Sequence, residues 1–237
     1  MSPINKLSKT QTILVIDPSS EHLAYTIAEI NLEEKNLHIW TTGMLFTPAS
    51  WPKGKRFTYM LKALEVIFNA NPIKSAVYTE QFFSNPGMMM GSAVVPTVNG
   101  IIELCAYKES PTIQKIQYSE ISPSSWRSIL QIKPDLSPDL LKTGVQKLNK
   151  KGLPKIKKDF KEPTKRTVEK MLNYTMPEEI ISNLNDKKRK IPYDVTDCLA
   201  ITLAIAKDHG IINNSIDERS FFNFNLHEHF KMIAEEI

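Results

Sequence analysis

Residues 12–17 read TILVID, a short run of aliphatic and β-branched residues that ends in a carboxylate. An uncharged run of this kind is typical of a strand that is buried in the protein interior. The residues that follow, Pro18, Ser19 and Ser20, are typical of a turn. Aspartate is rarely buried unless a charge or a metal ion compensates it. The stretch therefore predicts a central strand that delivers Asp17 to its end, and the chain has to supply what that carboxylate binds.

The hydrophobic pattern around this strand predicts a single α/β domain. Strands are expected at residues 12–17, 23–31, 37–45, 74–80 and 112–118, and helices at 55–70, 88–107, 122–131, 163–173 and 191–208. A polar turn joins the second and third strands, so the first three strands are expected to pair antiparallel. The later strands alternate with helices, which is typical of an α/β fold.

Length and composition agree with a globular protein. The chain has 237 residues, of which 41% are hydrophobic and 24% charged. Its first residues lack the charged and apolar regions of a signal peptide, and no apolar run approaches the roughly 18 residues of a membrane span. The two cysteines, Cys105 and Cys198, lie in apolar helical contexts and are expected to be reduced, as in a cytoplasmic protein.

Charge is distributed unevenly along the chain. Residues 142–170 contain eleven Lys or Arg and three acids, a net charge of +8, so the rest of the chain carries 4 − 8 = −4. A basic block on an otherwise acidic protein indicates a polyanionic partner, although a solvated lysine-rich loop explains the block equally well when it is taken alone.

Four acids occupy positions where acids are unusual. Asp17 and Glu80 each end an apolar strand, and Asp194 and Asp197 lie three residues apart on one face of an apolar helix. If the two strands are neighbours and the helix packs beside them, the four carboxylates meet. Such like charges repel one another, and a divalent cation relieves the repulsion. Carboxylate oxygens are hard ligands that suit Mg²⁺ or Mn²⁺.

Each acid also has an ordinary explanation when it is considered alone. Asp17 can begin a turn, Asp194 can favour the dipole in the first turn of its helix, and Glu80 can be a solvated strand end. The ordinary explanation requires these three coincidences together, whereas a metal site accounts for all of them.

Three motifs carry a family resemblance. ILVIDPSS at residues 13–20, VYTEQFF at 77–83 and YDVTDCLAIT at 193–202 resemble, in order and approximate spacing, the RuvC-type Holliday-junction resolvases. The resemblance extends from about residue 12 to residue 207. It implies an RNase H-like fold with a mixed five-stranded sheet, three antiparallel strands followed by parallel ones, flanked by helices. It also implies a homodimer and metal-dependent nicking of four-way DNA junctions.

The resemblance assigns roles by position. The residues matching the family's catalytic carboxylates are Asp17, Glu80, Asp194 and Asp197. Phe83 matches an aromatic residue that contacts bases near the junction centre. The helix that resembles the family's dimer helix would present Gly100, Ile101, Leu104 and Cys105 to a twin subunit.

This sequence departs from the family pattern in two ways. Ser19 replaces the glycine that follows Asp-Pro, and the chain is longer than a typical bacterial member. We expect one nuclease domain at residues 12–208 with a basic insertion at about 132–162, and a C-terminal extension at 209–237 to which no role is assigned. The extra length suggests a phage or viral variant, which would act in the host cytoplasm.

The expected chemistry is hydrolysis of a DNA phosphodiester with two Mg²⁺ or Mn²⁺ ions per site. Asp17 would bridge both ions, Glu80 would hold one, and Asp197 and Asp194 would hold the other. Junction binding should be largely electrostatic. The candidate phosphate contacts are Arg127, Lys155, Lys157, Lys158, Lys165 and Arg166.

The sequence is also compatible with other functions. The same metal site would serve a nuclease of RNA–DNA hybrids or of broader branched DNA. An ATPase of the actin or sugar-kinase type also begins with an aliphatic strand and an aspartate, but eight glycines in the whole chain leave few for phosphate loops. A non-catalytic architectural DNA-binding protein would gain nothing from four acids that repel phosphate unless a metal intervenes.

Overall fold

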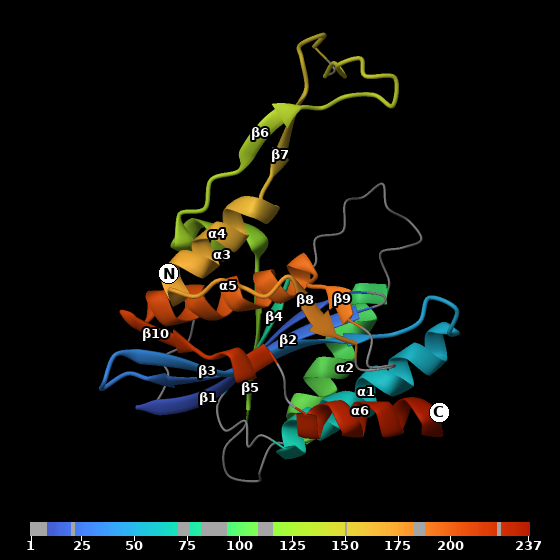
Figure 1. The fold of residues 1–237 in the computed structure, drawn as a ribbon, viewed down its shortest axis with the longest axis vertical. Coiled ribbons are helices and arrows are strands. Elements are labelled where there is room, and N and C mark those ends of the chain that lie inside the picture. Colours follow the sequence, from blue (N-terminus) through green and yellow to red (C-terminus); the bar gives the residue numbers. More distant parts are fainter. Residues whose placement is uncertain are drawn as a thin grey trace.

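A computed structural model describes residues 9–19, 22–70, 76–81, 94–108, 116–149, 151–182, 188–221 and 224–237. The described residues contain a six-stranded sheet in the order β10-β3-β2-β1-β4-β5 (Figure 1). Its strands are β1 Thr10–Pro18, β2 His22–Asn31, β3 Asn36–Phe46, β4 Ala76–Glu80, β5 Gln117–Ile121 and β10 Asn213–Ile216. The helices are α1 Lys53–Ala70, α2 Val94–Lys108, α3 Pro123–Leu130, α4 Lys161–Leu172, α5 Tyr193–Asp208 and α6 Phe224–Glu236, with a short 3-10 helix, η1, at Glu218–Phe221.

The pairing of the strands confirms the predicted mixed sheet. β1 pairs antiparallel with β2, and β2 with β3, whereas β4 pairs parallel with β1 and β5 parallel with β4. A sixth strand, β10, adds to the edge parallel to β3. The sequence did not predict β10 because its residues, Asn-Asn-Ser-Ile, lack a strand pattern, and an edge strand needs little apolar surface.

Helices cover both faces of the sheet and bury alternate residues of β1. Ile13 and Val15 pack in a core cluster with α3, α4 and α5. Leu14 and Ile16 pack on the opposite face with α1, α2 and α6. Successive strand residues point to opposite faces, so Asp17 follows Ile13 and Val15 toward the α5 face. The two buried cysteines lie in different clusters, on opposite faces.

The C-terminal residues pack on the domain. Ile211 and Phe221 belong to the core cluster on the α5 face, and Leu226 and Phe230 of α6 belong to the other. No helix in the described ranges is long and apolar enough to cross a membrane. The division into a domain at 12–208 and an extension at 209–237 stays a prediction.

Two small ribbons stand apart from the sheet. β6 (Asp135–Pro138) and β7 (Ile156–Asp159) form an antiparallel pair within the basic stretch, and β8 (Glu179–Ile181) pairs with β9 (Lys188–Lys190) before α5. The β6–β7 pair leaves the body of the protein beside α3 and α4 and extends away from the sheet (Figure 1).

Candidate active site

Asp17 and Glu80 end two neighbouring parallel strands. The register pairs Ile13 with Ala76 and Ile16 with Thr79, so one further step brings Asp17 beside Glu80. Ala76 and Tyr78 belong to the core cluster on the α5 face, and Glu80 points to that same face because side chains alternate along a strand. Both carboxylates therefore lie at the carboxyl ends of neighbouring strands, on the face of the sheet that α5 covers. Both residues are half-buried.

The first turns of α5 bring two more acids to these strand ends. Asp194 and Asp197 are half-buried, while Val195 and Cys198 between and after them are buried in the core. The Cys198 thiol, a weak donor, lies 3.9 Å from the backbone carbonyl of Val15, so the start of α5 lies over the last residues of β1. The sequence expectation that the helix packs beside the two strands is thus met in the structure.

Burial raises the pKa of all four carboxyl groups, and the charges of neighbouring acids raise it further for Asp17, Glu80 and Asp197. The pKa of Asp17 lies well above its ordinary value because of burial first, then the charges of Glu80, Asp194 and Asp197. Burial and the charges of Glu80 and Asp194 raise the pKa of Asp197 to about 7. Burial is also the first cause of the raised pKa values of Glu80 and Asp194. The four acids consequently form one electrostatically coupled group, hereafter the acid cluster.

Cationic and hydrogen-bonding side chains surround the acid cluster. The Trp126 indole N–H donates to Glu80 Oε1 at 2.9 Å. The Arg127 guanidinium lies between two aromatic rings, 4.6 Å from the ring centroids of Trp126 and Phe160. Its charge lowers the pKa of Asp17, Glu80 and Asp197 and so opposes the effect of burial. Arg127 is half-buried, and a guanidinium that can donate several hydrogen bonds in one plane has the chemistry to bind a phosphate group.

Local sequence fixes the position of these α3 residues. Ser122 caps the helix by accepting the Ser125 backbone N–H at 3.1 Å, and Pro123 occupies the first turn. The predicted helix start is confirmed. Trp126 is fully buried, and it orients α3 so that Arg127 reaches the acid cluster.

Two neighbours of the acid cluster were not identified from the sequence. The charges of His22 and Lys161 lower the pKa of Asp194. The antiparallel return from β1 to β2 brings His22 back to the end of β1, and Lys161 begins α4. The only sequence signal for His22 was its place directly after the turn, and Lys161 was hidden among the other lysines of the basic block.

Ser19, the departure from the family glycine, has a structural role in this turn. Its hydroxyl donates to the His22 carbonyl and accepts the His22 backbone N–H, both at 2.9 Å. Ser19 is not among the described residues with positive φ, so the turn needs no glycine there. The serine side chain closes the β1–β2 turn beside Asp17 with hydrogen bonds that glycine cannot make.

The acid cluster fits a divalent cation in its chemistry. Its oxygen donors are the hard ligands that Mg²⁺ and Mn²⁺ prefer. The pKa values of Asp17 and Asp197 are raised first by burial and then by the charges of the neighbouring acids, which a bound cation would compensate. Within the described ranges, no three His, Cys, Asp or Glu side chains are arranged around one point as metal ligands. Glu80 is turned toward the Trp126 indole, and four like charges without a counter-ion repel one another, so metal binding would require these side chains to reorient.

The predicted phosphate-binding residues divide between the acid cluster, the β6–β7 ribbon and α4. Arg127 is at the acid cluster. Lys155 and Lys157 pair with acids of the ribbon segment, Asp139 and Asp159, at 3.3 and 3.5 Å. Arg166 of α4 donates to both carboxylate oxygens of Asp135 at 3.2 and 3.1 Å, which holds the base of the ribbon.

The other two predicted lysines lie on β7 and α4. Lys158 lines a cavity next to Arg127, and Lys165 lies 4.0 Å from Glu169 on the same helix. Phe83 lies outside the described residues, so its predicted role in base contact stays a prediction.

One of the predicted dimer-interface residues faces the wrong way. Cys105 is fully buried against the sheet, and Ile101 packs beside the same core. Gly100 and Leu104 occupy the next ridge of α2 and are exposed, with Leu104 at 60%. Cys105 therefore cannot contact a partner subunit, and the outward side of α2 is formed by Gly100, Leu104 and Tyr107, which is also 60% exposed.

The fold described above, a mixed sheet with helices on both faces, is the RNase H-like fold of the RuvC-type resolvases. The chain is similar to Thermus thermophilus RuvC, solved in complex with Holliday junction substrate, with a TM-score of 0.55 and 13% identity over 82% of this chain and 91% of that one. It is also similar to the yeast mitochondrial Holliday junction resolvase Ydc2, with a TM-score of 0.52 and 13% identity over 99% of this chain and 88% of that one.

Comparisons by sequence add no further relative. No family model matches the chain, and no curated protein matches it. The likeness to the solved structures therefore concerns the fold, and a phage or viral origin stays a prediction.

Proposed function

We propose that this protein is a metal-dependent endonuclease that resolves four-way DNA junctions. The observation that carries the proposal is the acid cluster, in which two strand ends and one helix bring four carboxylates within electrostatic range of one another and of Arg127. The fold supports it, because one similar protein was solved in complex with Holliday junction substrate and another is a Holliday junction resolvase. Acids buried at such a cost to the fold are more consistent with a site than with a structural role.

Asp17, Glu80, Asp194 and Asp197 would hold Mg²⁺ or Mn²⁺. Bound divalent ions supply a nucleophilic water at neutral pH and stabilise the charge on the leaving 3′ oxygen. β1 is buried on both faces, so it holds Asp17 rigidly. The Trp126 N–H orients the Glu80 carboxylate, and Arg127 would bind a nonbridging oxygen of the scissile phosphate and orient it over the acid cluster.

A nicking assay on a synthetic four-way junction tests the proposal. The junction is compared with linear duplex, flap DNA and an RNA–DNA hybrid, each with Mg²⁺ and with EDTA. We expect paired nicks near the branch point of the junction, with Mg²⁺ only. Preferential cleavage of the hybrid would replace the proposal with a hybrid nuclease, and binding without cleavage of any substrate would support an architectural protein.

Arg127 provides a prediction within this site. Arg127→Gln is expected to lower kcat/KM for junction nicking by about 10²-fold, because glutamine lacks the charge that stabilises phosphate in the transition state. Single-turnover kinetics at saturating Mg²⁺ measure the effect. Arg219→Gln, at an exposed arginine of η1, is the matched control and should leave the rate unchanged; an unaffected Arg127 variant would remove this residue from the mechanism.

A homodimer would place two equivalent acid clusters against a substrate with approximate two-fold symmetry. The exposed ridge of α2, with Leu104 and Tyr107, is the candidate interface. Leu104→Lys is expected to shift the protein from dimer to monomer in sedimentation velocity, because it puts a charge into an apolar contact. Met232→Lys, at a residue of α6 with a similar exposure of 57%, should leave the dimer intact. A Leu104 variant that stays dimeric would exclude this face of α2 as the interface.

A further inference from the structure

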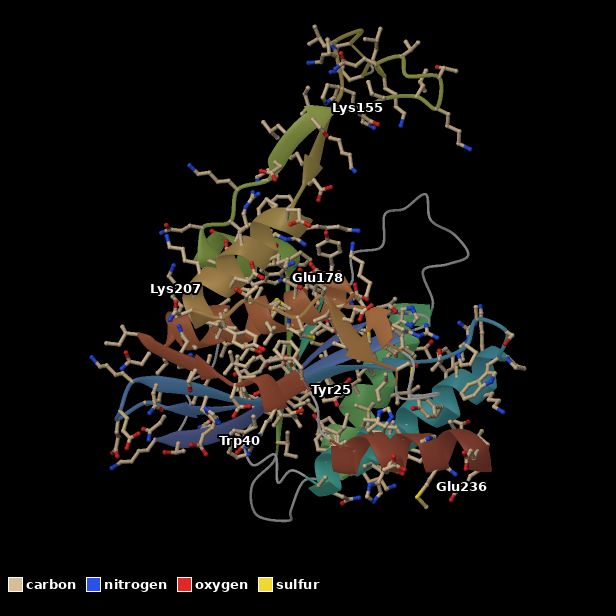
Figure 2. All side chains as sticks on the ribbon, viewed as in Figure 1. Tyr25, Trp40, Lys155, Glu178, Lys207 and Glu236 are labelled. Carbon is tan, nitrogen blue, oxygen red and sulfur yellow. The ribbon has the colours of Figure 1, made fainter. Side chains whose placement is uncertain are left out.

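The basic stretch forms a projecting arm with a defined tip. We define the arm as residues 135–159, which begin with β6 and end with β7. Figure 1 shows the arm extending from the α3 and α4 side of the protein, and Figure 2 shows Lys155 at the outer end of the β6–β7 pair, well away from the sheet. Apart from residue 150, the arm lies within the described part of the chain.

Three residues spaced eight apart hold the tip of the arm together. The backbone N–H of Asp139 donates to the Lys155 carbonyl at 2.9 Å, and the N–H of Lys155 donates to the Lys147 carbonyl at 2.8 Å. The N–H of Lys147 donates to the Asp139 carbonyl at 2.7 Å, which closes a ring of backbone hydrogen bonds. The Asp139 carboxylate accepts the Lys147 ammonium at 2.9 Å and pairs with Lys155 at 3.3 Å. These two lysines lower the pKa of Asp139. The tip is thus ordered by polar contacts rather than by a hydrophobic core.

Two tight hairpins leave this ring. Leu141 donates to the Val145 carbonyl at 2.7 Å and Asn149 to the Leu153 carbonyl at 2.8 Å, so each hairpin closes over a short turn. Each turn contains a glycine with positive φ, Gly144 at 81° and Gly152 at 74°, a conformation that other residues adopt at a cost.

The hairpins expose apolar side chains to an unusual extent. Of the twelve large hydrophobic residues that are exposed in the described parts of the chain, seven lie between Leu136 and Ile156. Leu140 and Leu148 occupy equivalent positions, each directly after a residue of the ring, and are 50% and 61% exposed. A segment that keeps its shape without burying its leucines is suited to present them to a ligand.

Charge indicates which ligand is complementary to this surface. Residues 139–158 contain seven lysines and one acid, Asp139, which two of the lysines already neutralise. Two arms of this charge would repel each other, which disfavours a second copy as the occupant. A polyanion that also offers apolar surface fits best, and DNA with unstacked bases has both properties.

The basic surface continues from the arm to the acid cluster. At the base of the arm, a cavity of about 630 Å³ is lined by residues that include Lys133, Lys158, Phe160 and Arg127. Arg127 acts electrostatically on the acid cluster. A phosphate backbone that lies over the acid cluster would therefore meet positive charge along a path that leads to the arm.

We propose that the arm is a second DNA-contacting element, whose lysines bind phosphates and whose hairpin leucines contact bases that are unstacked at a branch point. This inference rests on the proposed function. Apolar wedges between base steps are a general means of recognising deformed DNA, and an intact duplex hides the base faces that the leucines need. The arm would accordingly favour a branched substrate over a linear duplex of the same sequence.

Binding measured in EDTA, where no cleavage occurs, tests this inference on the full chain. The variant Leu140→Ser/Leu148→Ser is compared with the wild-type protein on a four-way junction and on linear duplex, over a range of salt concentrations. We expect a loss of junction affinity of about tenfold or more, an unchanged dependence on salt, and unchanged duplex affinity. Ile212→Ser removes a 73% exposed apolar side chain outside the arm and serves as the control.

A lysine variant separates the two contributions of the arm. Lys142→Gln/Lys151→Gln is expected to weaken binding to junction and duplex alike, and to reduce the slope of log affinity against log salt by up to about 2. A fluorescent adenine analogue at the branch point, which brightens when it unstacks, should respond to the wild-type protein and less to the leucine variant.

Several outcomes would overturn the inference. Junction affinity equal to wild type in the leucine variant, or an equal loss on duplex, would exclude contact with unstacked bases. A leucine variant that binds DNA normally but loses self-association or binding to anionic vesicles would assign the arm to a protein or lipid partner. Failure of the proposed function is distinguishable, because wild-type protein would then not nick the junction with Mg²⁺, whatever the arm binds.

Discussion

Asp17→Asn is expected to reduce metal-dependent nicking of a four-way junction by about 10³-fold or more. Asparagine has nearly the shape of aspartate, so the buried end of β1 is preserved, but its amide is a poor ligand for a divalent cation. The charges of Glu80, Asp194 and Asp197 all raise the pKa of Asp17. Asp17 therefore interacts electrostatically with every other member of the acid cluster. Single-turnover nicking rates at saturating protein and Mg²⁺ measure the loss.

Junction binding distinguishes a catalytic defect from a folding defect. In EDTA, the Asp17 variant should bind the junction at least as well as the wild type, because it removes a negative charge from a surface that phosphates approach. Asp208→Asn, at an exposed acid at the other end of α5, should nick normally. A near-normal nicking rate in the Asp17 variant would contradict both the metal site and the proposed function.

The acid cluster could be predicted because acids are anomalous where they end apolar elements. Asp17 follows four buried aliphatic residues of β1, and Asp194 and Asp197 lie on a helix whose remaining surface is mostly buried. The sequence could also predict that the elements meet, since sheet order and helix packing follow from the hydrophobic pattern. It could not predict the contacts of the carboxylates, such as the Trp126 hydrogen bond to Glu80, because these depend on the rotation of α3 about its axis.

Other features had no signal in the pattern. β10 is polar and is held to the sheet edge by backbone hydrogen bonds, to which any sequence contributes. The arm is ordered by the ring of hydrogen bonds between Asp139, Lys147 and Lys155 and not by a hydrophobic core. Its sequence therefore has no hydrophobic periodicity from which the structure could be predicted. The error at Cys105 has a simple geometric cause: neighbouring ridges of a helix differ by one residue, and only the tertiary structure selects which ridge faces the sheet.

Asp197→Asn is expected to stabilise the metal-free protein at pH 8 while it impairs catalysis. The pKa of Asp197 is raised from 3.8 to about 7, first by burial and then by Glu80 and Asp194. A raised carboxyl pKa means that the folded state holds the proton more tightly than the unfolded state. The stability that this proton provides is complete below about pH 4 and is lost as the pH rises through 7. Asparagine stays neutral at every pH and avoids that loss.

The expected gain in the free energy of unfolding at pH 8 in EDTA is about 2–4 kcal/mol. The upper value converts the whole pKa shift of Asp197 into free energy, and the lower value allows for the partial exposure of its side chain. Denaturant titrations at several pH values measure it, and the gain should vanish near pH 4. Mg²⁺ should reverse the order, because it stabilises the wild-type protein by binding the folded state alone and the variant much less. Equal stability of variant and wild type from pH 4 to pH 8 would contradict the raised pKa, and an equal effect of Mg²⁺ on both would exclude Asp197 as a ligand. With both expected results, the carboxylate charges that destabilise the metal-free protein would be the same charges that bind the ion, which links the repulsion within the acid cluster to the proposed activity.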